Sequence, residues 1–486
     1  MMKPYLLLVL LFRLSHTENE DAGIKGRITL KGFTYGLQAG IQELKSRLAS
    51  IHIPDVSGSV KVPVIGHVTY LVTQLQIENL DLSEQNVFLS TNTGVQLSVN
   101  KGQISVTGEL SIKTFLFSAK ARMNLLVRDL SFSAVIGITR DDLGHGVIWD
   151  AGCSSNVGHV DLSFHGGAGW LLDMFRNAML GPIYDALSKQ LCPEFDKTVM
   201  QVGEIMRHWP VSWRVDSVSA VEFPLVVPPN ITELILELGV KGEFVGIAQR
   251  WEAPFPPEKF VLPDIDSRML LLGLSQFTVN SAGYVHYKSG FLRANVTDDM
   301  IPKESPLRLN IKSLGIYAPE LPTRFPDSPP VLLQISASSP PFVSCQSNAL
   351  TVQVATDIQI FAMNPKQQLA PLFQLQSDGE FQVDLLLSEQ SLGAQLAEKN
   401  FSLTLVHSDV GPVKVAELQR FVSLALKVAC PLINKRLRDI YPFPISNLRL
   451  QNPTVQLLQG YIVIVTDFEL TDQSNNMTCN NLECNH

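Results

Sequence analysis

Two short stretches of the chain contain residue types that could support chemistry. "HGGAGW" at 165–170 has the glycines of an oxyanion-binding loop, and "DDLGH" at 141–145 offers carboxylates and an imidazole to a metal ion. Turns also favour glycine and aspartate, so the entry to a helix and a hairpin turn explain these stretches better. The sequence has no G-x-S-x-G, H-E-x-x-H, phosphate-binding glycine loop or C-x-x-C motif. We therefore predict no enzyme, no catalytic or metal-binding residue and no cofactor.

Cysteine and proline occur together in a pattern that an internal repeat would produce. "LSKQLCPEF" at 187–195 and "LKVACPLIN" at 426–434 each end a helix-patterned stretch on Cys-Pro, 238 residues apart. The six cysteines are an even number, which is typical of an oxidising compartment. Cys479 and Cys484 lie in a polar tail, 471–486. There a local disulfide and intermolecular pairing both remain open, and metal binding with His486 is disfavoured.

The N-terminus and the composition indicate a secreted protein. Lys3 precedes an apolar run from Tyr5 to Phe12, which is typical of a signal peptide, and we assign residues 1–17 to it. No later run reaches the ~18 apolar residues that a membrane span needs. The formal charge of −8 disfavours nucleic-acid binding. The expected glycosylation sites are the four Asn-x-Ser/Thr sequons, at Asn230, Asn295, Asn400 and Asn476.

Periodicity in the first half predicts a helix, then strands, then a long helix. Apolar residues at helical spacing predict helices over 37–51, stopped by Pro54, and over 171–191, kinked at Pro182. Alternation over 95–106, interrupted by Asn100-Lys101-Gly102, predicts an antiparallel hairpin between them.

The second half repeats this order. Phe277-Thr278 aligns with Phe33-Thr34, strand patterns fill 307–405, and a helical stripe covers 415–432 with the second Cys-Pro near its end. We infer a tandem duplication of residues 18–245 and 265–470, joined by a stiff proline-rich linker at 246–264.

These elements predict an α+β fold with a tubular interior in each half. A twisted antiparallel sheet wrapped on two long helices makes an elongated barrel. If the helices do not fill it, an apolar tube remains that can hold a hydrocarbon chain. The candidates for pocket walls are Leu37, Ile41, Leu44, Leu171, Met174 and Leu187 in the first half, and Phe277, Leu418, Val422 and Ala425 in the second.

Several longer segments occur in an order that a known family shares. They are "AGIKGRITLKGFTYGLQAGIQELKSRLASIHIPD" at the start, "CSSNVGHVDLSFHGGAGWLLDMF" from Cys153, "TDDMIPKES" at 297–305, "ISASSPPF" at 335–342 and "HSDVGPVKVAELQ" at 407–419. The chain thereby resembles the bactericidal/permeability-increasing protein and lipopolysaccharide-binding protein family, of the lipid transfer and lipopolysaccharide-binding superfamily. The resemblance implies a boomerang of two tandem barrels joined by a central sheet, with one acyl-chain pocket in each barrel.

The resemblance also bears on the cysteines and on the charged tip of the first barrel. It implies a disulfide between Cys153 and Cys192, whereas Cys345 and Cys430 could form an extra bridge or remain two buried thiols. Endotoxin-binding members carry many Lys and Arg residues at this tip. The matching hairpin, "ISVTGELSIKTFLFSAKAR", is poorly basic. The candidates for headgroup contact are Lys61, Lys113, Lys120 and Arg122.

The expected function is that of a secreted, extracellular, non-enzymatic and monomeric lipid-binding protein. The resemblance implies that it takes acyl chains of lipopolysaccharide and phospholipids into two apolar pockets, with phospholipid as a bound ligand. It would contact the bacterial outer membrane or lipid particles peripherally, in innate defence against Gram-negative bacteria. Two alternatives remain: a phospholipid or neutral-lipid carrier that has lost lipopolysaccharide recognition, and an interaction protein with filled barrels.

Overall fold

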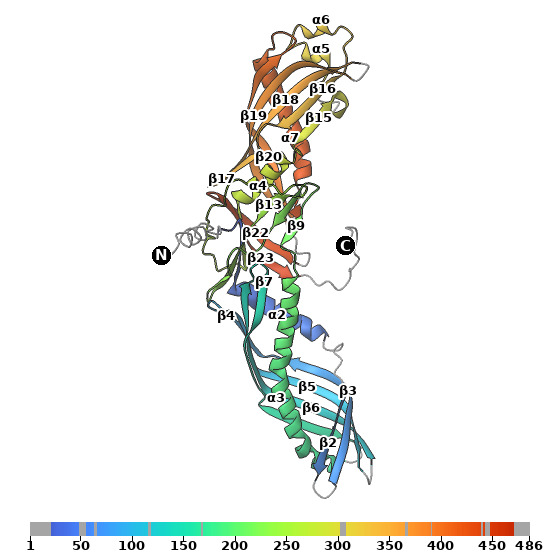
Figure 1. Cartoon of the computed structure of the whole chain (residues 1–486). Helices are drawn as coiled ribbons and strands as arrows, with labels where there is room; N and C mark the ends of the chain where they lie inside the picture. Colours follow the sequence, from blue (N-terminus) through green and yellow to red (C-terminus); the bar gives the residue numbers. More distant parts are fainter. Residues whose placement is uncertain are drawn as a thin grey trace, which may run out of the picture.

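The protein is an elongated, sheet-dominated α+β molecule, with two large sheets at opposite ends and a smaller one between them (Figure 1). No described helix is long and apolar enough to span a membrane. The computed structural model describes residues 21–47, 55–62, 66–114, 118–166, 169–301, 308–364, 368–389, 391–438, 441–442 and 448–470.

The central sheet joins the two halves of the chain. Its strand order is β11 (Asn230–Ile231), β12 (Ile235–Val240), β1 (Ile24–Thr29), β14 (Leu270–Ser275), β23 (Tyr461–Leu470) and β22 (Leu448–Leu458). β1 and β14 pair antiparallel with Gly26 opposite Leu272, and each leads into a helix, α2 (Leu30–Arg47) or α4 (Gln276–Lys288). β12 and β23, late strands of the two halves, flank this pair symmetrically. The mirrored order supports the internal repeat.

The N-terminal sheet carries one long helix. Its strands are β2 (Val56–Val62), β3 (Gly66–Asp81), β5 (Gly94–Lys113), β6 (Ser118–Arg140) and β7 (Gly146–Asn156), with β4 (Glu84–Ser90) on β5 and β8 (His159–His165) on β6. Helix α3 (Gly169–Arg207) lies along β7 and β8 (Figure 1). Side chains of alternate residues, such as Leu110 and Ile112, are buried beneath it in the sheet.

The C-terminal sheet has a similar plan. Its strands are β15 (Arg293–Thr297), β16 (Val331–Ala337), β18 (Ala349–Met363), β19 (Leu369–Leu387), β20 (Ser391–Ser408) and β21 (Tyr441–Pro442), with β17 (Phe342–Gln346) on β18. Helix α7 (Val415–Leu437) packs against β20. The short helices η2 (Asp298–Met300), α5 (Ile311–Leu314) and α6 (Leu321–Arg324) lie between β15 and β16 in the chain. A fourth, small sheet has the order β13 (Glu243–Gly246), β10 (Ser219–Glu222), β9 (Ser212–Arg214).

The structure differs from several of the sequence predictions. Among the described residues neither seven-stranded sheet closes, because β2 does not pair with β7 and β15 does not pair with β21. In the described part of the second half no second long helix lies on the sheet, since the 13-residue α4 packs against β13 and β17. The predicted hairpin over 95–106 is wrong. Lys101 has a φ of 54°, but it lies at a register shift inside the continuous strand β5.

Neither long helix ends at its Cys-Pro pair. α3 continues past Pro193 to Arg207, and α7 continues past Pro431 to Leu437. A proline inside a helix removes one backbone hydrogen bond and disfavours the turn before it. Packing of the following turns against the sheet, where Val199 is 4% exposed, offsets that cost in α3.

A buried arginine fastens the linker to the central sheet. Arg27 on β1 is 5% exposed, and its guanidinium lies 2.6 Å from a Glu237 carboxylate oxygen on β12. It also donates to the backbone oxygens of Pro263, at 2.8 Å, and Leu262, at 3.2 Å. One side chain of the first strand thus binds both a neighbouring strand and the linker.

We predict that Arg27→Met destabilises the protein by about 2–4 kcal/mol, because it leaves two carbonyl groups without their donor and leaves the half-buried Glu237 carboxylate with Lys25, at 3.8 Å, as its remaining cation. Urea unfolding followed by circular dichroism measures the change. Arg449→Met, at an exposed position of the same sheet, is the matched control. Equal unfolding midpoints for the two variants would contradict the assigned role of Arg27.

A second ionic contact across the centre makes the stability of the protein depend on pH in the acid range. Burial raises the pKa of Asp467, but hydrogen bonds from Lys31, Arg268 and the Met269 amide outweigh it and lower the pKa below its ordinary value. The stabilising contribution is therefore present above the unfolded-state pKa of about 3.9 and is lost as the pH falls through the folded-state pKa.

We expect Asp467→Asn to be less stable than wild type at pH 7 and the difference to shrink below pH ~4. A constant difference would contradict this, and Asp378→Asn, at an exposed site, is the control.

Candidate functional site

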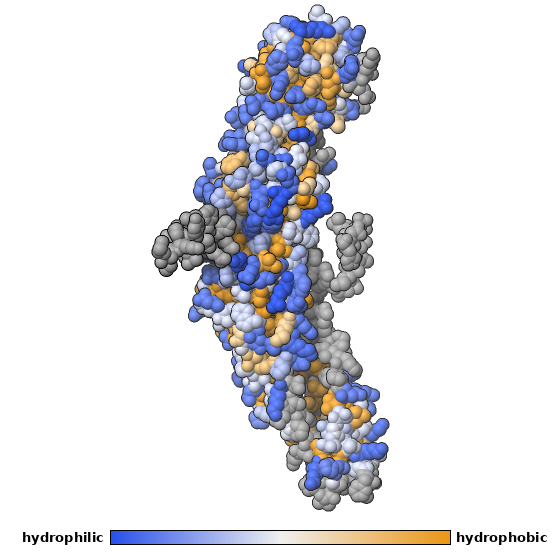
Figure 2. Space-filling model, in the orientation of Figure 1, coloured by the Kyte–Doolittle hydropathy of each residue, from blue (hydrophilic) through white to orange (hydrophobic). Residues whose placement is uncertain are grey.

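The C-terminal half contains a cavity of about 300 Å³ whose wall is almost entirely apolar. It lies between α7 and the inner face of the sheet formed by β16, β18, β19 and β20. Apolar residues also reach the surface over this end of the molecule, as Figure 2 shows. The lining residues are Leu309, Leu314, Leu333, Ile335, Val354, Thr356, Ile358, Ile360, Phe373, Leu375, Ser377, Gly379, Phe381, Phe401, Leu403, Leu418, Val422 and Leu426.

Strand and helix periodicity explain why these side chains converge. The wall residues of β18 and β19 occupy alternate positions, 354 to 360 and 373 to 381, so they point to one face of the sheet. Leu418, Val422 and Leu426 recur every four residues of α7 and form one stripe facing them. The cavity therefore lies between two regular apolar surfaces, one on the sheet and one on the helix.

Two amide side chains hold α7 on the edge of the sheet. Gln419 accepts a hydrogen bond from the Leu403 amide at 3.2 Å and donates to the Phe401 oxygen at 3.1 Å. Asn434, 7% exposed, accepts from the Leu396 amide at 2.8 Å and donates to its oxygen at 3.0 Å. These bonds satisfy backbone groups of β20 on the side away from β19. The helix is thus positioned by polar contacts at one side of its apolar stripe, and sequence reasoning missed both residues.

The structure brings together only some of the predicted pocket residues. Leu418 and Val422 line the cavity, and the side chain of Ala425 lies outside the described part. Phe277 does not line it: this residue lies on α4, is 5% exposed, and has its ring 6.0 Å from that of Phe255 in the linker. Its place in the chain made it look equivalent to a pocket residue, but α4 packs at the centre of the molecule.

In the N-terminal half, the described candidates belong to the packed core. Ile41 is 7% exposed, and Leu37 packs against a cluster that includes Val87 and Leu236. The side chains of Leu44, Leu171, Met174 and Leu187 lie outside the described residues. An N-terminal pocket therefore stays a prediction.

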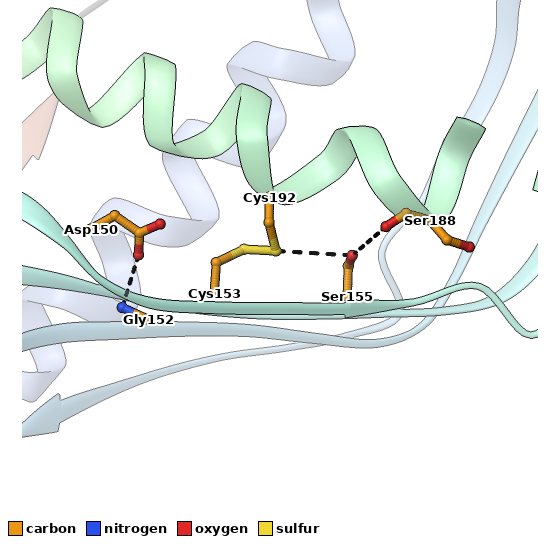
Figure 3. Close-up of a disulfide and its surroundings, with 6 residues drawn as sticks. All are labelled: Asp150, Gly152, Cys153, Ser155, Ser188 and Cys192. Atoms are coloured by element: carbon orange, nitrogen blue, oxygen red, sulfur yellow. Dashed lines mark hydrogen bonds between the residues drawn. A yellow bond between two sulfur atoms is a disulfide. The ribbon is translucent and has the colours of Figure 1, made fainter. Parts of the chain in front are cut away.

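The cysteines divide into one disulfide and two buried thiols. Cys153 on β7 is bonded to Cys192 on α3, which ties the long helix to its sheet (Figure 3). Cys345 and Cys430 are free, so the possible extra bridge does not form. The Cys345 thiol donates to the backbone oxygens of Leu458 and Tyr461 at the central sheet. Cys430 lies on α7, and burial raises the pKa of both thiols. Cys479 and Cys484 lie outside the described residues.

The four headgroup candidates are exposed at the far end of the N-terminal sheet. Lys113 and Lys120 line an outer hollow of about 530 Å³. Arg122 is directly opposite Glu109 on the neighbouring strand, and Lys61 is opposite His67. Their strand neighbours in the sequence, such as Ile112 and Ala121, are buried. The cations therefore lie on the outer face, opposite the buried apolar face.

Of the sequons, Asn230, Asn295 and Asn400 are exposed, and Asn476 lies outside the described residues.

Comparisons with known proteins point to one family. Residues 32–202 match the N-terminal domain of the LBP / BPI / CETP family, and residues 213–470 match its C-terminal domain. A bactericidal permeability-increasing protein of Sebastes schlegelii is 33% identical over 454 residues, covering 93% of this chain and 96% of its own. A human lipopolysaccharide-binding protein is 26% identical over 462 residues, covering 94% and 96%. A crystal structure of lipopolysaccharide binding protein has a TM-score of 0.59 at 23% identity, covers 93% of this chain and all of its own, and shares the fold.

We predict that Gln419→Leu destabilises the C-terminal half by about 1–3 kcal/mol, because it leaves backbone groups of β20 without partners at the helix contact. Hydrogen exchange of the β20 amides measures the local effect. Gln376→Leu, at an exposed position of β19, is the control. Unchanged protection of the Leu403 amide would show that Gln419 does not hold the helix.

Proposed function

The chain belongs to the LBP / BPI / CETP family, and from this premise we propose that it is a secreted, non-enzymatic lipid-binding protein. It takes the acyl chains of amphiphiles into an apolar pocket in each half of a boomerang-shaped molecule, as a monomer that meets membranes or lipid particles at their surface. The single observation that supports this most is the cavity between α7 and the C-terminal sheet.

The size and chemistry of this cavity suit a hydrocarbon chain. Its volume of about 300 Å³ is at the small end of ligand pockets, and 16 of the 18 residues that line it have no polar side-chain atom. Burial of eight methylenes contributes roughly 6 kcal/mol at about 0.8 kcal/mol each. Immobilisation of the chain offsets several kcal/mol of this. Chain burial therefore supplies most of the affinity, and headgroup contacts adjust the selectivity.

Two ligand classes compete, and the tip residues distinguish them. The relatives named for lipopolysaccharide binding favour lipopolysaccharide as a ligand, with a role in defence against Gram-negative bacteria. Lys61, Lys113, Lys120 and Arg122 are the groups that would contact its phosphates. The second candidate is a phospholipid or neutral-lipid carrier without lipopolysaccharide recognition. The observation in its favour is Glu109, which lies opposite Arg122 on the same face and repels phosphate.

We predict that Val422→Phe lowers the number of lipids that co-purify with the protein, because the ring occupies part of the C-terminal cavity. Native mass spectrometry of the secreted full chain counts the lipids, and we expect at least one fewer per molecule. Val406→Phe, at a 53% exposed position of β20, is the matched control. An equal lipid count in both variants would reject the C-terminal cavity as a lipid site.

Titrations at physiological salt separate the two ligand classes. We expect wild-type protein to bind labelled lipid A and phosphatidylcholine, and Lys113→Gln with Lys120→Gln to weaken lipid A binding several-fold while phosphatidylcholine binding is retained. Binding of phosphatidylcholine alone by the wild type would establish the second candidate instead.

A further inference from the structure

One pair of hydroxyl groups interrupts the apolar wall of the C-terminal cavity. Thr356 on β18 and Ser377 on β19 are directly opposite each other in the sheet, and their hydroxyl oxygens are 2.6 Å apart. Both residues line the cavity, and Ser377 is 5% exposed. The residues two positions before and after them along each strand are Val354, Ile358, Leu375 and Gly379, so the pair is isolated among apolar neighbours.

The hydrogen-bonding capacity of the pair exceeds what it uses. Two hydroxyl groups carry two protons, and the bond between them uses one. In the described part of the chain, neither side chain makes a second hydrogen bond. The pair is part-buried, and a plain hydrocarbon that covers it would shield the remaining O–H from water without supplying an acceptor, which is costly. The remaining O–H can be satisfied by a ligand that brings an oxygen to this point of the wall.

The pair is accessible from the cavity, because both residues belong to its lining. Gly379 follows Ser377 on the same face, and the ring of Phe381 covers it, since a Cβ built there would lie 2.8 Å from that ring. Ser377 and Thr356 are smaller than the leucine, isoleucine and phenylalanine residues around them.

We propose that Thr356 and Ser377 form a polar subsite that accepts an oxygen atom carried by the bound lipid chain, so that the cavity favours oxygen-bearing chains over plain hydrocarbon. The chemistry is that of a hydrogen-bond acceptor in an apolar tube, either an ester carbonyl of a glycerolipid or a hydroxyl of a hydroxyacyl chain. This inference rests on the proposed function, because it assigns the selectivity of the same cavity.

The test compares paired ligands on wild-type protein and on the double variant Thr356→Val, Ser377→Ala. Octadecanoic acid and positional hydroxyoctadecanoic acids form the hydroxyl arm, and diester and diether phosphatidylcholines form the ester arm. We expect wild type to bind the oxygen-bearing member of at least one arm about three- to tenfold more tightly, as one added hydrogen bond allows. The double variant should bind both members equally, and the arm that responds identifies the source of the oxygen.

A matched control lies on the same strand. Thr351 on β18 is directly opposite Ser344 on β17, and neither residue lines the cavity. Thr351→Val, Ser344→Ala makes the same chemical change there and should keep the wild-type preference. A preference that survives in the Thr356→Val, Ser377→Ala variant, or that is absent from wild type in both arms, overturns the subsite. Failure of wild type to bind any of these lipids would instead overturn the proposed function.

Discussion

The antiparallel pairing of β1 with β14 is the contact on which the rest of the molecule depends. Each strand is the first described strand of its half, and each is followed directly by a helix, so the pairing sets the direction in which both halves extend. Arg27 strengthens this junction because its buried guanidinium also binds Glu237 and the linker carbonyls. A buried charge with one missing partner is far more costly than the pair is favourable. The centre is therefore held by backbone pairing and by side-chain contacts together, and its stability does not depend on filling the cavity in the C-terminal half.

The cavity exists because α7 is fixed at one side instead of being packed across the whole sheet. Gln419 and Asn434 bind the backbone of β20, where the sheet has few further strand partners. Polar contacts at fixed distances keep the helix from collapsing onto the wall opposite. An apolar gap of this kind is unfavourable for stability, since its lining loses contacts that a filled core would have. Such a cost is consistent with a site that a ligand occupies, because the ligand restores the missing contacts.

The sequence was sufficient for the long helices and for most strand regions, and insufficient for the mutual placement of these elements. The apolar stripe of α7 predicted Leu418 and Val422 as wall residues because helical periodicity is a local property. The prediction of a hairpin over 95–106 was wrong because Lys101 and Gly102 lie at an irregularity within one long strand, and the sequence of such an irregularity resembles that of a turn. The prediction that Phe277 lines the pocket was wrong because α4, though aligned with α2 in the sequence, packs at the centre of the molecule. Thr356 and Ser377 could not be predicted, since only the strand register brings residues 21 positions apart together.

Alternation along the strands places exposed cations and buried apolar residues on opposite faces of the N-terminal sheet. At the end of the N-terminal sheet, Lys113, Lys120 and Arg122 face outward, whereas Ile112, Ala121 and Met123 are buried on the other face. A one-residue change of register would exchange the two sets, so cations and apolar wall cannot occupy the same face. Under the proposed function, a lipid whose headgroup is bound by the outer cations must therefore bend around the edge of the sheet for its chains to reach the inner face. Substitutions can consequently alter the charge of the tip without altering the apolar inner face, because the two properties depend on side chains of opposite orientation.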